Sequence, residues 1–317
     1  MFKKISTPAL LIVLALLAGI VLFKKFYQEK KDESTFRAQF VKIDTAAVSS
    51  ILIYPKAESG KEVKLFKKGS SWELQNDRIK TIADSNTVRS VLAMFTDLKA
   101  VSLAGLDKTS WDELQTGDTS GTRIKITTND NQVYDMVVGK FAFNPGSRNG
   151  LSYIRHYGEE EVYAVDGFLS FGVNQGFDAW RNKVFMRGDQ NDFTTFTFSY
   201  PGDSSFQLSK LNNEWLVNGE KADSLKTNQF LAMVSNMQAG GFADNYKPAT
   251  TPVFTLNILG NNLDPVIIVA YQADTVQKYI LHSSLNPDAY FTDSPGSLAG
   301  RLFVSRNHFA ASPVVAD

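Results

Sequence analysis

Cysteine is absent from the 317-residue chain. Its absence excludes disulfides, thiolate metal ligands and cysteine nucleophiles together, and it leaves the redox compartment undetermined. An excess of positive charge is also missing, because 33 lysine and arginine residues balance 33 aspartate and glutamate residues. Such a surface offers no net field to gather a polyphosphate chain, so we expect no nucleic acid among the partners.

The motifs of common catalytic sites are missing as well. The sequence contains neither a G-x-S-x-G turn for a serine nucleophile nor a G-x-x-x-x-G-K-[ST] loop for phosphate. Its three histidines, His156, His282 and His308, lack the close spacing of a zinc site. The acidic run 159–161 is typical of a solvated hairpin turn. We therefore predict no catalytic residue, no metal site and no cofactor.

One long apolar segment stands near the N-terminus. Residues 5–23 carry no charge, and a pair of lysines bounds them on each side. As a helix, the segment would be ~28 Å long, close to the ~30 Å thickness of a hydrocarbon core. The sequence predicts a short flank at 1–4, a transmembrane signal anchor at 5–23 and a charged linker at 24–39.

A cleaved signal peptide is the alternative for this segment, since a basic start and an apolar run fit its first two regions. Ala15 and Ala18 are small residues, but they lie inside the apolar run and no polar segment precedes them, which favours a retained anchor. The lysine count alone favours a cytoplasmic C-terminal side, but long domains translocate largely regardless of flanking charge. We predict a single-pass protein of the inner (cytoplasmic) membrane with an extracytoplasmic, periplasmic C-terminal domain. A sensor domain that faces the cytoplasm is the alternative.

Beyond the linker, the sequence contains a tandem repeat. The pattern L-x-K-x4-W, an Ala-Asp-Ser helix cap and a Leu-Ala-Met triplet occur in the same order in both halves. These elements are Leu65, Lys67, Trp72, 83–85 and 92–94 in the first half, and Leu208, Lys210, Trp215, 222–224 and 231–233 in the second. A period above ~100 residues indicates tandem domains, because solenoid repeats run ~20 to 50 residues.

Each half predicts one amphipathic helix and several strands. The helix faces consist of Val88, Val91, Leu92, Phe95 and Leu98 in the first half, and Phe230, Leu231, Val234 and Met237 in the second. Alternating runs predict strands at 122–128, 134–138, 152–156, 161–165, 253–259, 266–270, 279–282 and 289–292. The expected fold class is α+β: an N-terminal transmembrane helix followed by two tandem, duplicated modules of antiparallel sheet with one amphipathic helix each, at 40–187 and 188–317.

Two segments have the composition of contact surfaces. The loop predicted at 141–150 places Phe141 and Phe143 beside Arg148, which is typical of partner binding; rings that fold back on the sheet are the alternative. The Phe- and Gly-rich segment 168–181 ends the first half. We expect its Asp178, Trp180 and Arg181 at an inter-module contact, with Asp178 and Arg181 paired across one helical turn.

Three stretches together carry a family resemblance: "ILIYPKAESGKEVKLFKKGSSWEL", "ADSNTVRSVLAMFTDLKA" and "YIRHYGEEEVYAVD". They resemble the bacterial family named domain of unknown function 4340. The resemblance runs from about residue 48 to 185, ending in "FDAWRNKVF", and it is weaker in the second half. It implies a membrane-anchored extracytoplasmic protein associated with ABC-transporter components of the gliding-motility type, and it brings no site residues.

These observations favour a non-enzymatic, membrane-tethered extracytoplasmic binding or scaffolding protein, accessory to an ABC-type transporter or envelope assembly. Its expected partners are the membrane, through the single-pass anchor, and a membrane-protein complex such as ABC transporter subunits. The alternative is an envelope hydrolase with a site between the two modules.

Overall fold

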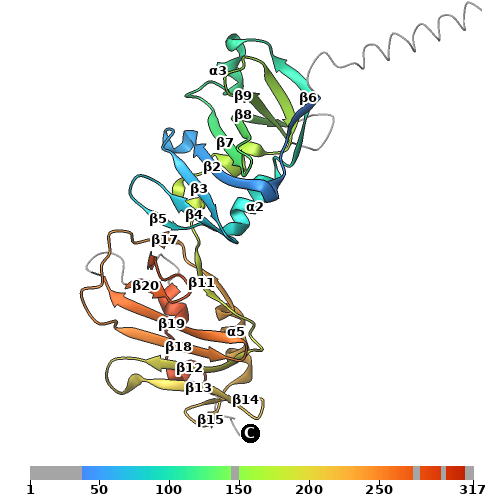
Figure 1. The fold of residues 1–317 in the computed structure, drawn as a ribbon. Coiled ribbons are helices and arrows are strands. Elements are labelled where there is room, and N and C mark those ends of the chain that lie inside the picture. Colours follow the sequence, from blue (N-terminus) through green and yellow to red (C-terminus); the bar gives the residue numbers. More distant parts are fainter. Residues whose placement is uncertain (1–37, 144–149, 274–278, 294–297, 311–317) are drawn as a thin grey trace, which may run out of the picture. The chain divides into compact units, whose positions relative to one another are not determined.

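The computed structural model describes residues 38–143, 150–273, 279–293 and 298–310 (Figure 1). The predicted anchor at 5–23 lies outside these residues. Within them, no helix has both the length and the apolar character needed to cross a bilayer. The predictions of a transmembrane signal anchor, and of the inner-membrane, periplasmic location that depended on it, are therefore corrected, because the structure does not support them.

The chain divides into two compact units, which we describe separately. The first contains the described residues of Met1–Glu62 together with Ser90–Asn174. The second contains Val63–Arg89 together with the described residues of Gln175–Asp317. The module boundaries predicted above, 40–187 and 188–317, stay a prediction.

An antiparallel sheet forms the first unit, with the strand order β1-β6-β10-β9-β8-β7-β2. Alternating side chains explain its core: along β7, for example, Ile124 and Ile126 are fully buried, whereas Lys125 between them and Arg123 before them are half-buried. The elements are β1 (Gln39–Lys42), β2 (Val48–Tyr54), β6 (Asp97–Gly105), β7 (Thr122–Thr128), β8 (Val133–Phe143), β9 (Gly150–His156), β10 (Val162–Asp166), α3 (Trp111–Leu114) and α4 (Leu169–Val173).

The second unit contains a nine-stranded sheet in the order β15-β14-β13-β12-β18-β19-β20-β21-β17. It also contains the meander β3-β4-β5 and the strand pair β11–β16. The strands are β3 (Val63–Lys68), β4 (Ser71–Gln75), β5 (Lys80–Ile82), β11 (Val184–Arg187), β12 (Phe193–Ser199), β13 (Phe206–Leu211), β14 (Glu214–Val217), β15 (Glu220–Lys221), β16 (Asn236–Gln238), β17 (Gly241–Phe242), β18 (Phe254–Gly260), β19 (Leu263–Gln272), β20 (Tyr279–Ser283) and β21 (Tyr290–Thr292). The helices are α5 (Ser224–Val234) and α6 (Leu298–Leu302). Helix α2 (Ser85–Ala93), which precedes β6 in the chain, is divided between the two units after Arg89.

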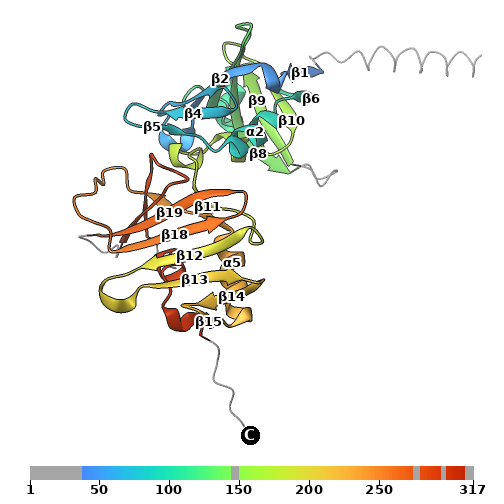
Figure 2. The same ribbon diagram turned by 60° about the horizontal axis from the view of Figure 1, so that its bottom comes forward.

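Aromatic packing fills the core between the nine-stranded sheet and α5, which lies against the sheet in both views (Figures 1 and 2). Phe198 of β12 is fully buried; its ring stacks on Phe206 at a centroid distance of 4.3 Å and contacts Phe230 of α5 and Phe309. At the start of α5, the Asp223 carboxylate accepts a hydrogen bond from the Lys226 backbone N–H at 3.0 Å. This helix cap satisfies one of the donors that a helix leaves unpaired at its first turn.

The predicted fold class is wrong. Strands account for 47% of the described residues and helices for 20%, so the protein is mostly β. The structure shows neither a transmembrane helix nor a two-module arrangement of sheet and helix in its described part. The physical reason is that α2 and α5 are short, with nine and eleven residues, and most apolar residues lie in strands.

The helix prediction extended too far, although the chosen apolar residues are buried. Helix α2 ends at Ala93, so Phe95 and Leu98 lie beyond it, and Leu98 belongs to strand β6. Helix α5 ends at Val234, and Met237 belongs to β16. Buried residues therefore recur at a spacing of three or four residues beyond the end of each helix. The eight predicted strands all coincide with observed strands to within a few residues.

Substitution Phe198→Ala should lower the free energy of unfolding by about 3–5 kcal/mol, because a buried ring is replaced by a cavity. Urea unfolding followed by circular dichroism measures the change. The control Leu211→Ala removes an apolar side chain that is 59% exposed, so its effect should stay within about 0.5 kcal/mol. Equal effects of the two substitutions would contradict the central position of Phe198.

Candidate functional site

Strands β8 and β9 of the first unit present two different surfaces. Their register pairs Phe141 with Ser152 and Phe143 with Gly150. Because successive side chains of a strand point to opposite faces, Phe141, Phe143 and Ser152 share one face of the sheet. The opposite face carries Lys140 and Tyr153, and the Lys140 ammonium lies 5.8 Å from the centroid of the Tyr153 ring.

Four exposed phenylalanines gather on the first of these faces, and we call them the phenylalanine patch. The set is Phe141 and Phe143 of β8, Phe168 before α4, and Phe171 in α4. Ring centroids lie 4.7 Å apart for Phe141 and Phe171 and 5.9 Å apart for Phe143 and Phe168. Exposed fractions range from 38% for Phe141 to 68% for Phe143. Large rings in mutual contact thus remain open to solvent.

The strand β9 fixes the position of the α4 rings. The Ser152 hydroxyl, which is buried, donates to the Gly167 carbonyl at 2.7 Å and accepts from the Leu169 backbone N–H at 2.9 Å. Gly150 permits the close approach of Phe168, because a Cβ atom at this position would lie 2.2 Å from the ring. These two contacts fix the position of the Phe168 and Phe171 rings beside β9.

The structure changes the sequence-based description of this site. Phe141 and Phe143 lie within strand β8 and not in a loop, and Arg148 lies outside the described residues. Phe168 and Phe171 belong to the segment 168–181, and their rings complete the patch with Phe141 and Phe143. The end of β8 and the start of α4 come together only in the tertiary fold, and no spacing in the sequence predicts that contact.

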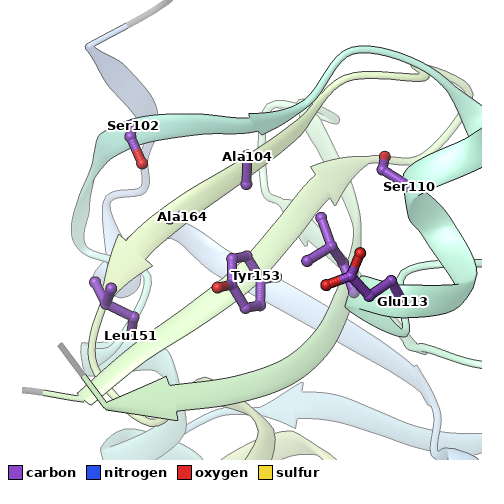
Figure 3. A pocket seen from close by; sticks show the side chains of 8 residues that line it. Ser102, Ala104, Ser110, Glu113, Leu151, Tyr153 and Ala164 are labelled. Atoms are coloured by element: carbon purple, nitrogen blue, oxygen red, sulfur yellow. The ribbon is translucent and has the colours of Figure 1, made fainter. Parts of the chain in front are cut away.

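A hollow opens on the other face of the sheet (Figure 3). Its volume is about 360 Å³. Figure 3 shows Tyr153 in the middle of the hollow, with Ser102 on one side and Ser110 and Glu113 on the other. The full lining is Ser102, Ala104, Ser110, Glu113, Leu114, Leu151, Tyr153 and Ala164.

Arg155 holds the helical wall of this hollow. Its fully buried guanidinium donates to the Thr116 carbonyl at 2.6 Å, pairs with the Asp118 carboxylate, and stacks 3.8 Å from the centroid of the Trp111 ring. The Trp111 indole N–H donates to the Glu160 carbonyl at 2.9 Å. The acidic turn 159–161, predicted as merely solvated, therefore anchors α3 through its backbone.

The predicted contact residues of the second segment form a charge cluster within the second unit. The Arg181 guanidinium lies 3.2 Å from Asp178 and donates to both oxygens of Asp244 at 2.8 and 2.7 Å. It also stacks 3.4 Å from the centroid of the Phe242 ring. Trp180 is fully buried, and its indole nitrogen has no hydrogen-bond partner among the described residues. The inter-module role of Asp178, Trp180 and Arg181 stays a prediction.

All three histidines have identifiable neighbours, since the His308 ring contacts the Phe309 ring edge to face at a centroid distance of 5.0 Å. His156 stacks on Phe40 at a centroid distance of 4.3 Å, and the His282 Nε2 atom lies 3.2 Å from the Pro287 carbonyl oxygen. In the described part of the chain, no group of three or more His, Cys, Asp or Glu side chains could hold a metal ion.

A polar cluster on β2, β7 and β8 raises the pKa values of Arg123 and Tyr54. Arg123 donates to both oxygens of Asp135 at 2.9 and 2.7 Å, which raises the pKa of Arg123 through that hydrogen bond. The Tyr54 hydroxyl donates to Glu62 at 2.6 Å. Burial, followed by this hydrogen bond, raises the pKa of Tyr54 to about 12.

The family model described as Domain of unknown function (DUF4340) matches residues 72–256, which is more than half of the chain. The chain belongs to this family. No curated protein and no solved structure matches it. The match confirms the family resemblance, and it carries no statement about membrane attachment or transporters. The phenylalanine patch and the hollow both lie within the matched part of this family member.

Substitution Arg155→Met should lower the free energy of unfolding by about 2–4 kcal/mol, since the buried Thr116 carbonyl loses its charged donor. Urea unfolding measures the loss, and the emission of Trp111 should shift as its stacked cation disappears. Arg306→Met is the control: Arg306 is exposed and pairs with Glu220, so about 0–1 kcal/mol is expected. A loss no larger than that of the control would overturn the anchoring role.

Tyr54 should stay neutral at pH values where an ordinary tyrosine, with a pKa of about 10, ionises. The pKa of Tyr54 is higher in the folded chain than in the unfolded chain. Its contribution to the free energy of unfolding is therefore fully present below pH ~10 and is lost as the pH rises towards about 12. The difference in tyrosinate absorbance between the wild type and Tyr54→Phe measures this pKa, with circular dichroism to verify folding at each pH. Glu62→Gln should lower it, and a difference spectrum that titrates near pH 10 would contradict the assignment.

Proposed function

We propose that the protein is a non-enzymatic binding protein that docks a partner protein through the phenylalanine patch. The observation that carries the proposal is the mutual contact of Phe141, Phe143, Phe168 and Phe171 at a solvent-exposed surface. Surface apolar residues that occur singly need no explanation, whereas a contiguous apolar patch marks an interaction site.

The energetic gain from covering the patch is large. Full burial of one phenylalanine contributes about 1.5–3 kcal/mol relative to its exposure. Phe143 and Phe171 are 68% and 58% exposed, so most of that contribution is still unused in the isolated chain. Aromatic residues are also enriched among the few side chains that dominate binding energies.

The patch needs little rearrangement before it binds. Contacts with the other rings restrict each phenylalanine, while Ser152 and Gly150 fix the backbone at the start of α4. Binding then costs less side-chain entropy than it would for freely rotating rings. Preorganisation of this kind supports docking as the role of the patch.

The partner that fits has an apolar surface segment that the rings can cover. We propose that this partner is a subunit of a membrane-protein complex such as an ABC transporter, because the family resemblance favours that class of partner. A second copy of this chain is the competing occupant, and the experiment below separates the two.

The test compares Phe143→Ser/Phe171→Ser with the matched control Leu211→Ser/Leu225→Ser, which removes two leucines that are 59% and 68% exposed in the second unit. Each full-length protein captures partners from detergent-solubilised membranes, and the captured protein is purified and titrated. We expect the patch variant to raise the Kd by at least about thirtyfold, as loss of two central aromatic contacts does. The control should leave the Kd unchanged.

Three results would contradict the proposal. The first is a partner whose affinity is the same for the wild type and the patch variant. The second is self-association in sedimentation experiments that only the patch substitutions abolish, since the occupant would then be a second copy. The third is a monomer that hydrolyses an envelope polymer and captures nothing, which would favour the hydrolase alternative.

A further inference from the structure

The hollow beside α3 is a second surface, independent of the phenylalanine patch, and its chemistry differs. Small side chains, Ala104 and Ala164, leave space over neighbouring strands β6 and β10, while the Tyr153 ring stands on β9 between them and α3 (Figure 3). A volume of about 360 Å³ lies at the small end of the range for ligand pockets. It suits one small ring and not an extended chain.

The wall of the hollow is built to be rigid. Gly105 and Gly139 let the α3 segment lie directly on the strands, because a Cβ atom would meet the Ser110 side chain at the first and the Leu114 carbonyl at the second. Arg155 fastens the end of the same segment through the Thr116 carbonyl. The hollow is therefore preformed, which lowers the entropic cost of binding.

The charges around the hollow balance. The Glu113 carboxylate lies 4.0 Å from the Lys140 ammonium, and both side chains are in contact with solvent. A balanced pair attracts neither a strongly anionic nor a strongly cationic ligand. Both groups can instead exchange hydrogen bonds with neutral hydroxyls, as acceptor and donor respectively.

Several polar groups at the hollow have unused hydrogen-bonding capacity. Among the described residues, the hydroxyls of Ser102 and Tyr153 have no hydrogen-bond partner. The Ser110 hydroxyl donates to the Asp107 carbonyl at 2.7 Å, so its oxygen can still accept. The hollow is thus lined by two serine hydroxyls, the hydroxyl of Tyr153 itself and the Glu113 carboxylate, and the Lys140 ammonium lies 5.8 Å from the centroid of the Tyr153 ring.

We infer that this hollow binds a single neutral sugar ring. The weakly positive C–H groups of a pyranose pack on the negative face of the Tyr153 ring, and its hydroxyls bond to Glu113, Lys140 and the serines. An aromatic body with a few convergent polar groups is the usual composition of a small-molecule site. The inference does not rest on the proposed docking function, because the two surfaces lie on opposite faces of the β8–β9 pair.

Saturation-transfer difference NMR on the full chain tests the inference with glucose, galactose, mannose and N-acetylglucosamine as probes. We expect a saturable signal from the ring protons of at least one sugar. Tyr153→Leu, which removes the aromatic face but keeps an apolar side chain, should raise the Kd at least about tenfold. Glu113→Gln should raise it about fivefold, because a charge-assisted hydrogen bond becomes a neutral one.

The control is Glu58→Gln, which changes an exposed carboxylate elsewhere in the first unit and should leave the Kd unchanged. Glu113 is 83% exposed in its side chain, so its variant should fold even if Tyr153→Leu does not. No signal from any of the four sugars, or a signal that both hollow variants leave intact, would overturn the inference. A saturable signal from alanine with none from a sugar would also overturn it, since the site would then recognise a zwitterion.

Discussion

Two buried polar side chains of strand β9 support both candidate surfaces. Ser152 exchanges hydrogen bonds with the backbone around the start of α4, and Arg155 binds the backbone just after α3. The helices α3 and α4 contain only four and five residues, and helices shorter than ~12–15 residues are marginal in isolation. Their conformation therefore depends on tertiary contacts, and these two residues supply polar contacts from the core of the sheet.

The pairing of β8 with β9 determines which surface each helix completes. Ser152 and Arg155 differ by an odd number of positions, so they point to opposite faces of the sheet. A shift of the register by one residue would move the phenylalanines of β8 to the side of the hollow. Strand pairing and surface chemistry are thus coupled, and the buried residues Val138 and Ile154, which face each other in this register, oppose any such shift.

Local sequence signals predicted the strands well and the helices less well. Alternation of apolar and polar residues is a property of each strand alone, which is why β7 was placed at its observed bounds. The end of α2 depends on where the chain must turn into β6, and Phe95 stays buried beyond that turn. The overall α+β class failed for the same reason, since apolar spacing reports burial and does not by itself distinguish helix from turn.

The candidate sites were only partly predictable because their residues converge from distant segments. Phe141 and Phe143 stood out as two rings near a cation, whereas their contact with Phe168 and Phe171 requires the tertiary fold. Arg155 gave no signal, because an arginine in an alternating strand is normally a solvent-facing residue. Burial of this guanidinium is favourable only because a carbonyl, a carboxylate and an indole ring replace its water.

A buried Arg155 and four exposed phenylalanine rings are physically consistent within one unit. A buried charge is costly to leave unpaired, so Arg155 restricts α3 to the position in which the Thr116 carbonyl and the Asp118 carboxylate meet its guanidinium. The exposed rings differ from Arg155, because most of the free energy that burial of a phenylalanine can contribute is gained only when another surface covers them. The first unit therefore uses buried polar interactions to fix the shape of its surface and leaves these aromatic rings exposed, which is consistent with the docking role proposed above.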